Sequence, residues 1–223
     1  MRIELWSDLV CPWCYLGKRR LERALSDFPH RAEVEVVHRA FELDPTRPPG
    51  QTFDRVESLA SKYGLTAQRA RGLEEEMERR AAGDGLTYHL LGGVVGNTFD
   101  AHRVIHLGRA AGREDAVLER LYRAHFTEQR SIFDRASLAD LAGAAGHAPP
   151  AVREALAGDA AAAEVRLEEQ TARELGVTGV PFFVLDGRYA ISGAQPVELL
   201  ATALRRAWSE RRAAAPAPAP GQR

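Results

Sequence analysis

The sequence predicts an α/β fold, a layered sheet flanked by helices with an all-helical segment inserted into it. Strand-like segments occur near both ends of the chain, and helix-like segments fill the middle. Clusters of Pro and Gly separate these regions. With 223 residues, the chain can bury the core of one domain with an insertion, or of two small domains.

The first segment of the chain has the pattern strand, helix, strand. Residues 3–6 form the first expected strand. Residues 15–28 form an amphipathic helix, because apolar residues recur at intervals of three and four from Leu21 to Phe28. The β-branched residues within 32–40 predict a second, buried strand. Prolines at and after position 45 end this unit.

From about Thr52 to Ala163 the pattern is helical throughout. The expected helices cover residues 53–63, 67–82, 98–111, 114–127, 137–144 and 151–157. Thr66, Thr98 and Ser137 are the candidate N-caps, because a hydroxyl can accept a hydrogen bond from a free N–H of the first helical turn.

The last segment returns to a helix, two strands and a helix. The first helix covers about 160–175 and ends at Gly176. Strands are expected at 180–185 and 189–191, joined by a tight Asp-Gly turn, and a helix follows from 196 to about 211. Without the middle segment, the order is βαβ and then αββα, which is the order of the thioredoxin fold.

Four ranges follow from this order. Residues 1–45 and 164–212 are the two parts of a thioredoxin-fold domain, and residues 46–163 are the inserted helical domain. Residues 213–223 are expected to be a disordered Ala/Pro tail, because their composition cannot bury a core.

Charge and hydropathy exclude several kinds of partner. The 30 basic and 31 acidic residues are interleaved along helical segments, so nucleic acid is not an expected partner. The chain has no apolar run long enough to span a membrane, so no membrane partner is expected. Met1-Arg2 leads directly into the first strand, so we expect no signal peptide and a cytoplasmic protein, either a monomer or a homodimer.

The only two cysteines form a Cys-Pro-Trp-Cys motif at positions 11–14, where the first strand ends and the first helix begins. Both sulfurs can lie on one side of the first turn. The free N–H groups and the helix dipole favour a thiolate at Cys11, with a pKa between about 3.5 and 7.5, and Pro12 suits the first turn. We predict a dithiol redox site in which Cys11 is the nucleophile and Cys14 the resolving thiol.

A metal site is the alternative interpretation of this cysteine pair. A structural zinc ion needs four ligands, and the chain has no second cysteine pair. The seven histidines show no spacing typical of metal ligands. We therefore expect no metal.

Residues 176–182 supply the second candidate part of the site. A proline that opens a central strand is unusual, because it has no N–H for the strand ladder. It is explained if the Val180–Pro181 bond is cis and the loop faces the two cysteines. The backbone of Val180 would then be free to pair with a bound peptide or thiol.

Together these motifs resemble the DsbA branch of the thioredoxin superfamily, and specifically its FrnE-like, cytosolic members. The resemblance covers nearly the whole chain except the tail. The segments that carry it are residues 7–17 around the cysteines, 41–45 (Phe-Glu-Leu-Asp-Pro), 97–103 (Asn-Thr-Phe-Asp-Ala-His-Arg), 179–184 (Gly-Val-Pro-Phe-Phe-Val) and 192–196 (Ser-Gly-Ala-Gln-Pro).

The resemblance implies thiol–disulfide oxidoreductase or isomerase activity on protein or small-molecule thiols and disulfides. It makes Cys11 the nucleophile, Cys14 its partner and Pro181 the cis proline. The residues expected to bind substrate are Pro12, Trp13, Asn97, His102 and Val180. Asn97 and His102 belong to the family's helical motif and are expected to line the cleft opposite the cysteines. Their alternative roles are structural, Asn97 as an N-cap and His102 as an interior histidine.

The chain departs from this pattern in two ways. Related thioredoxins place a buried carboxylate six residues before the first cysteine, where this chain has Leu5. Glu4 and Asp8 are close by in sequence, but neither is assigned as a base. The chain also lacks the extra cysteines that relay electrons in some relatives. Reoxidation must therefore come from outside partners or small disulfides, with glutathione as a candidate co-substrate and no bound cofactor.

Three alternative functions stay open. The same architecture resembles the 2-hydroxychromene-2-carboxylate isomerases and kappa-class glutathione transferases, which commonly have Ser at the position of Cys11. The retention of both cysteines favours redox chemistry over this class. A holdase that binds unfolded chains through apolar groups such as Trp6, Trp13, Tyr15 and Phe182 is the second alternative. The third is a tailoring role in secondary metabolism, as suggested for some FrnE-like proteins.

Overall fold

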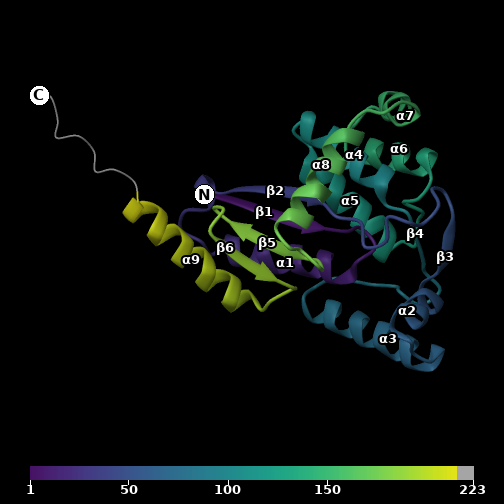
Figure 1. Ribbon diagram of the computed structural model, residues 1–223, viewed down its shortest axis with the longest axis horizontal. Helices are drawn as coiled ribbons and strands as arrows, with labels where there is room; N and C mark the ends of the chain where they lie inside the picture. Colours follow the sequence, from purple (N-terminus) through teal and green to yellow (C-terminus); the bar gives the residue numbers. More distant parts are fainter. Residues whose placement is uncertain (215–223) are drawn as a thin grey trace, which may run out of the picture.

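A four-stranded mixed sheet lies at the centre of the computed structural model, which describes residues 1–214 (Figure 1). Its strands are β1 (Arg2–Ser7), β2 (Glu35–Ala40), β5 (Phe182–Leu185) and β6 (Tyr189–Ser192), in the order β2-β1-β5-β6. β1 pairs in parallel with β2 and antiparallel with β5, and β6 pairs antiparallel with β5. The predicted thioredoxin order of elements is confirmed.

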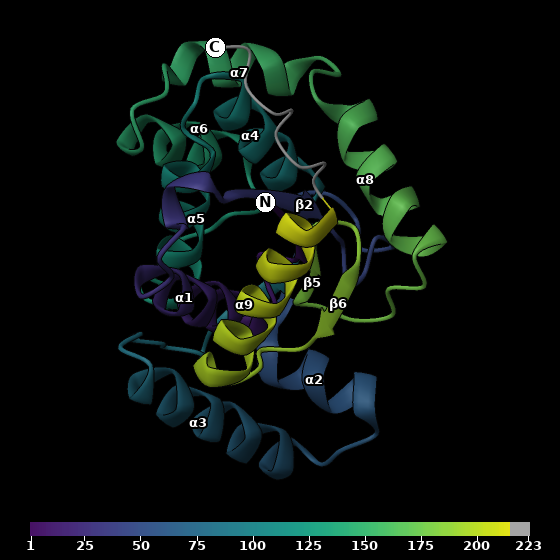
Figure 2. The same cartoon turned by 90° about the vertical axis from the view of Figure 1, so that its left-hand side faces the viewer.

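Helices cover both faces of the sheet (Figure 2). Side chains alternate between the faces along β1 because successive residues of a strand point in opposite directions. Ile3 and Leu5 are buried against α1 (Pro12–Ser26) and α9 (Val197–Ala214). Trp6 is buried on the other face, beside α8 (Ala162–Glu174), and its Nε1 donates to the backbone oxygen of Glu168 at 3.1 Å.

The inserted helices pack around a second core. They are α2 (Arg55–Tyr63), α3 (Ala67–Gly83), α4 (Phe99–Ala110), α5 (Glu114–Phe126), α6 (Arg135–Ala144) and α7 (Pro149–Ala157). Apolar side chains of α4–α7, such as Val104, Leu121 and Leu141, form this core, and Cys14 and Leu16 of α1 belong to it. α1 thus contacts the sheet with one face and the insertion with the other.

The insertion also contains a small sheet that the sequence analysis did not anticipate. β3 (Thr52–Asp54) and β4 (Val94–Gly96) pair antiparallel, so the expectation of a helical pattern throughout residues 52–163 is corrected at these two places. Each strand has three residues, which is too short to show the alternation typical of a strand. The fold class itself, a thioredoxin fold with a helical insertion, is confirmed.

The three predicted N-caps have different outcomes. Thr66 caps α3 as predicted, accepting from the N–H of Arg69 at 3.2 Å. Ser137 is not a cap, because α6 begins two residues earlier and the carboxylate of Asp134 accepts from the N–H of Ser137. Thr98 occupies the N-cap position of α4 without a side-chain bond to that helix.

The end of the chain is helical further than expected. α9 continues to Ala214, two residues into the predicted tail, and residues 215–223 of that tail lie outside the described residues. Within residues 1–214, no helix is both long and apolar enough to cross a membrane.

Glu168 of α8 joins the sheet to the insertion. Its carboxylate accepts from Arg39 of β2 at 2.7 Å, from Arg109 of α4 at 2.9 Å and from the N–H of Ala40 at 2.7 Å. His106 Nε2 of α4 lies 2.9 Å from the same carboxylate. Burial opposes the charge, but these donors hold the pKa of Glu168 well below its usual range.

We expect Glu168→Gln to lower the free energy of unfolding by about 3 kcal/mol at neutral pH, because two arginines then lose their buried counter-charge. The low pKa of Glu168 in the folded protein adds stability above the unfolded pKa of about 4.3, and this stability is lost as the pH falls. Urea denaturation at several pH values should therefore show a smaller loss on acidification in the variant. Glu164→Gln, an exposed change one turn earlier on α8, is the matched control. Equal stability of the two variants would contradict the role of Glu168.

Candidate functional site

The two cysteines lie at the N-terminus of α1. Cys11 is the N-cap residue, Pro12 is the first helical residue, and the N–H of Cys14 donates to the backbone oxygen of Cys11 at 3.0 Å. Both thiols are free; Cys11 is 5% exposed and Cys14 is fully buried. One turn of helix therefore leaves a small part of Cys11 exposed and places Cys14 behind it, and the roles of attacking and resolving thiol stay predictions.

The surroundings separate the pKa values of the two thiols. A hydrogen bond from the Cys14 thiol lowers the pKa of Cys11, and the N–H groups of Cys14 and Trp13 lower it further, against the effect of burial. Burial raises the pKa of Cys14 well above its usual value, and its hydrogen bond to Cys11 raises it further. The thiolate is thus favoured at Cys11, and Cys14 keeps its proton.

The loop before β5 closes one side of the site. The Val180–Pro181 bond is cis, as predicted. The thiol of Cys11 donates to the backbone oxygen of Val180 at 3.5 Å. Pro181 packs against α1 at Gly17, where an added Cβ would lie 2.8 Å from Cγ of the proline. The absence of a side chain at Gly17 therefore lets this loop approach the cysteines.

Side chains of the insertion hold the other side of the site. Nη1 and Nη2 of Arg55, on α2, both donate to the backbone oxygen of Val10 at 3.2 Å. Arg55 is itself fixed by Glu74 of α3 at 3.1 Å. The hydroxyl of Tyr88 donates to the backbone oxygen of Pro12 at 2.9 Å. These bonds fix the turn that carries both thiols.

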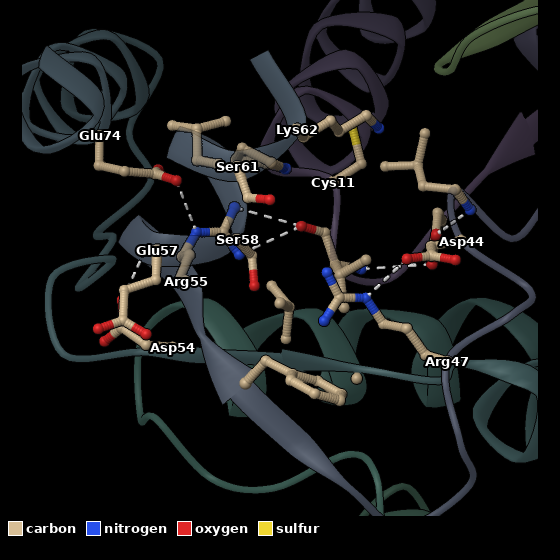
Figure 3. A pocket seen from close by; sticks show the side chains of 18 of the residues that line it. Cys11, Asp44, Arg47, Asp54, Arg55, Glu57, Ser58, Ser61, Lys62 and Glu74 are labelled. Carbon is tan, nitrogen blue, oxygen red and sulfur yellow. Dashed lines mark hydrogen bonds and ion pairs between the residues drawn. The ribbon is translucent and has the colours of Figure 1, made fainter. Parts of the chain in front are cut away.

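A cavity of about 1360 Å³ opens beside Cys11, between α1 and the α2–α3 part of the insertion. Pro12 and Trp13 line it together with Cys11, and Trp13 is 40% exposed. Figure 3 shows Cys11 across the cavity from Ser58 and Ser61 of α2. The other apolar side chains on the walls include Phe53, Leu59, Tyr63 and Met77. The cavity can thus offer apolar contacts and hydroxyl groups to a molecule that reaches Cys11.

Asn97 and His102 do not line this cavity, and their expected role in binding substrate stays a prediction. Among the described residues that line the cavity, neither is present. The amide of Asn97 donates to Glu42 at 3.0 Å and accepts from the N–H of Phe99 at 3.0 Å. His102 is 2% exposed and lies behind the cysteines, with Nε2 3.7 Å from Asp8 Oδ1.

Several residues of the site were not found from the sequence. Arg55, Tyr88 and Gly17 act through backbone atoms or close packing with residues distant in the chain, and no local pattern marks them. Asp8 was noted but not assigned, although its position three residues before Cys11 was a usable signal. Among residues 1–214, no group of three or more His, Cys, Asp or Glu side chains is arranged to hold a metal ion.

Comparison with known proteins places this geometry among related folds. The family model described as a DSBA-like thioredoxin domain matches residues 2–205. A solved structure of a probable DsbA oxidoreductase from Streptomyces coelicolor is 46% identical, with a TM-score of 0.92 over 100% of this chain and 94% of that chain.

Two more distant structures share the fold. A 2-hydroxychromene-2-carboxylate isomerase is 18% identical, with a TM-score of 0.67 over 96% of this chain and 100% of its own. The cytosolic disulfide reductase DsbM from Pseudomonas aeruginosa, solved with glutathione, is 19% identical, with a TM-score of 0.61 over 94% and 100% of the two chains.

We expect Gly17→Ala to destabilise the protein by about 1–3 kcal/mol, because the new methyl group would overlap Pro181 and push the loop away from Cys11. Gly72→Ala is the matched control: it lies inside α3 with nothing within 4 Å of an added Cβ, and should stabilise that helix by up to about 1 kcal/mol. Thermal unfolding of both variants measures the difference. Two variants of similar stability would show that the contact at Gly17 is unimportant.

We expect Cys14→Ala to raise the pKa of Cys11, because the hydrogen bond from Cys14 is the largest influence that lowers it. The pH dependence of alkylation of Cys11 by iodoacetamide reports this pKa. The variant should react more slowly than wild type below the pKa of Cys11, with its midpoint moved to higher pH. An unchanged midpoint would mean that the helix N-terminus alone sets the reactivity of Cys11.

Proposed function

The chain belongs to the DSBA-like thioredoxin domain family, and from this premise we propose that it is a thiol–disulfide oxidoreductase that exchanges disulfides through Cys11 and Cys14. The observation that carries the proposal is the contrast between the two thiols of one helical turn. Cys11 borders an open cavity and has a lowered pKa, whereas Cys14 is buried behind it with a raised pKa. An attacking and a resolving thiol require this contrast.

The reaction proceeds through a mixed disulfide. The Cys11 thiolate attacks one sulfur of a substrate disulfide, and the other substrate sulfur leaves as a thiolate. Cys14 then loses its proton and attacks Sγ of Cys11, which releases the second substrate thiolate and leaves a Cys11–Cys14 disulfide. The reverse sequence oxidises a substrate dithiol. The backbone oxygen of Val180, 3.5 Å from the Cys11 sulfur, lies where it can pair with a bound peptide or thiol.

We propose that the substrates include small-molecule disulfides, with glutathione as co-substrate in a cytoplasmic setting. The cavity of about 1360 Å³ is larger than the 300–1,000 Å³ typical of small-ligand pockets, so a tripeptide disulfide would fit within it. The similarity to a cytosolic disulfide reductase solved with glutathione supports this choice. The chain also carries no cysteine other than Cys11 and Cys14, so electrons must enter or leave through an external thiol.

The first experiment is the reduction potential of the Cys11–Cys14 pair in glutathione redox buffers. We expect one two-electron transition that is lost in both Cys11→Ser and Cys14→Ser. Comparison of this potential with that of the glutathione pool then shows whether the pair acts as an oxidant or as a reductant. A difference of about 30 mV corresponds to about 1.4 kcal/mol for this two-electron couple.

Activity measurements with the same variants separate the competing functions. Disulfide reductase activity should fall by orders of magnitude in Cys11→Ser, because a hydroxyl is a far weaker nucleophile than a thiolate at neutral pH. If wild type binds glutathione without forming an internal disulfide, and Cys11→Ser stays active as an isomerase, the oxidoreductase proposal is wrong. The glutathione-dependent isomerase class would then be the better assignment.

A further inference from the structure

A buried group of ionisable side chains lies beside Cys14, and one of its members, Asp8, also borders the cavity. Asp8 is 1% exposed and His102 is 2% exposed, and they come from the β1–α1 loop and from α4. Oδ2 of Asp8 accepts from the N–H of Leu43 at 2.7 Å, and Oδ1 lies 3.7 Å from Nε2 of His102. Nε2 has no hydrogen-bond partner among the described residues. A buried imidazole nitrogen is thus directed at a buried carboxylate that has room to share a proton with it.

This pair is adjacent to the resolving thiol. The N–H of Asp8 donates to Sγ of Cys14 at 3.4 Å, so the backbone of Asp8 contacts the sulfur that must become a thiolate. Cys14 is fully buried, and water has no direct access to its proton. The position where related thioredoxins have a buried carboxylate is Leu5 here, and Leu5 points into the apolar core against α1 and α9.

We propose that Asp8 and His102 together accept the proton of Cys14 when Cys14 attacks the mixed disulfide on Cys11. This assignment rests on the proposed function. The proton moves from the Cys14 thiol to the pair, the Cys14 thiolate forms a bond to Sγ of Cys11, and the bond from Cys11 to the substrate sulfur breaks. The substrate leaves as a thiolate, so that no other oxidant or reductant is needed. Asp8 is the acceptor beside Cys14, and His102 is the positioning residue that shares the proton.

The alternative acceptor next to Cys14 is Tyr122 of α5. Its hydroxyl is buried and has no partner within the described residues. Burial and the nearby Cys14 raise the pKa of Tyr122 well above its usual value. Tyr122 therefore stays protonated and can donate a hydrogen bond, but cannot take up the proton of Cys14.

The pair has a connection to the surface through two further carboxylates. Glu42, after β2, and Glu169, on α8, face His102, and both accept from Arg166 at 2.8 Å. The Arg166 side chain is half exposed. Burial and the neighbouring Glu169 raise the pKa of Glu42 to about 7, so this carboxyl can hold or release a proton near neutral pH. A small cavity beside His102 is bounded by the other ionisable groups that face it, namely His38, Arg39, His106, Arg109 and Glu168.

The test follows the two thiol steps separately. Reduced protein is mixed with oxidised glutathione, quenched with acid at intervals, and weighed by mass spectrometry. Formation of the glutathione adduct reports the attack by Cys11, and decay of the adduct reports the attack by Cys14. We expect Asp8→Asn and His102→Gln to slow adduct decay at about pH 7 on the order of a hundred-fold, while adduct formation stays near the wild-type rate.

The pH profile and a matched control distinguish proton transfer from loosened packing. In the variants, decay should accelerate with rising pH as hydroxide takes over, whereas wild type should depend less on pH. The double variant should be no slower than either single variant, because the two residues act as one unit. His106→Gln is the control: His106 lies one turn further along α4 and also faces a buried carboxylate, Glu168.

Three results would overturn the assignment. The first is that the adduct decays at the wild-type rate in both His102→Gln and Asp8→Asn over the whole pH range. If Asp8→Asn does not fold, the rate in His102→Gln alone decides this point. Another is an equal slowing in His106→Gln, which would indicate a general structural effect. The third is a wild-type protein that keeps glutathione on Cys11 and forms no internal disulfide. That result would reject the proposed function as well, whereas the first two leave it standing.

Discussion

The turn that carries the two thiols is held in place by side chains of the inserted segment, and the rest of the site depends on this contact. The backbone oxygens of Val10 and Pro12 lie just before and at the start of α1 and accept from Arg55 and Tyr88 of the insertion. These bonds tie the turn to the insertion, and a buried hydrogen bond lost from this contact would cost free energy. The insertion is therefore part of the site as well as the wall of the cavity.

The packing of α1 against the insertion gives the thiols of Cys11 and Cys14 different environments. Cys11 is the N-cap residue and lies next to free N–H groups, the backbone oxygen of Val180 and the cavity. Cys14 lies one turn deeper, in the core that α1 shares with the insertion. The position of Cys11 beside the cavity and of Cys14 behind it is what the proposed roles of attacking and resolving thiol require. It also creates the need for an internal proton acceptor, because the deeper thiol is shielded from water.

Helix α8 connects the two parts of the molecule with consecutive carboxylates. Glu168 binds Arg39 of the sheet and Arg109 of α4, whereas Glu169 turns to Arg166 and Glu42. The first carboxylate fixes the position of α4 relative to the sheet. Glu169 belongs to the ionisable groups that surround His102. Two adjacent residues of α8 therefore connect the position of α4 with the ionisable groups near Cys14.

The sequence alone determined those features that depend on nearby residues. The order of strands and helices, the helix that starts at the two cysteines and the cis bond before Pro181 all follow from local periodicity, capping and breaker residues, or from motifs that a resemblance makes specific. Strands β3 and β4 were missed because three residues carry too little local signal. The tertiary structure decided the rest: it placed Asn97 beside Glu42 and His102 beside Asp8, and it gave Gly17, Arg55 and Tyr88 their roles. Each of these roles depends on a contact between segments far apart in the chain, and such contacts are set by packing, which no local pattern records.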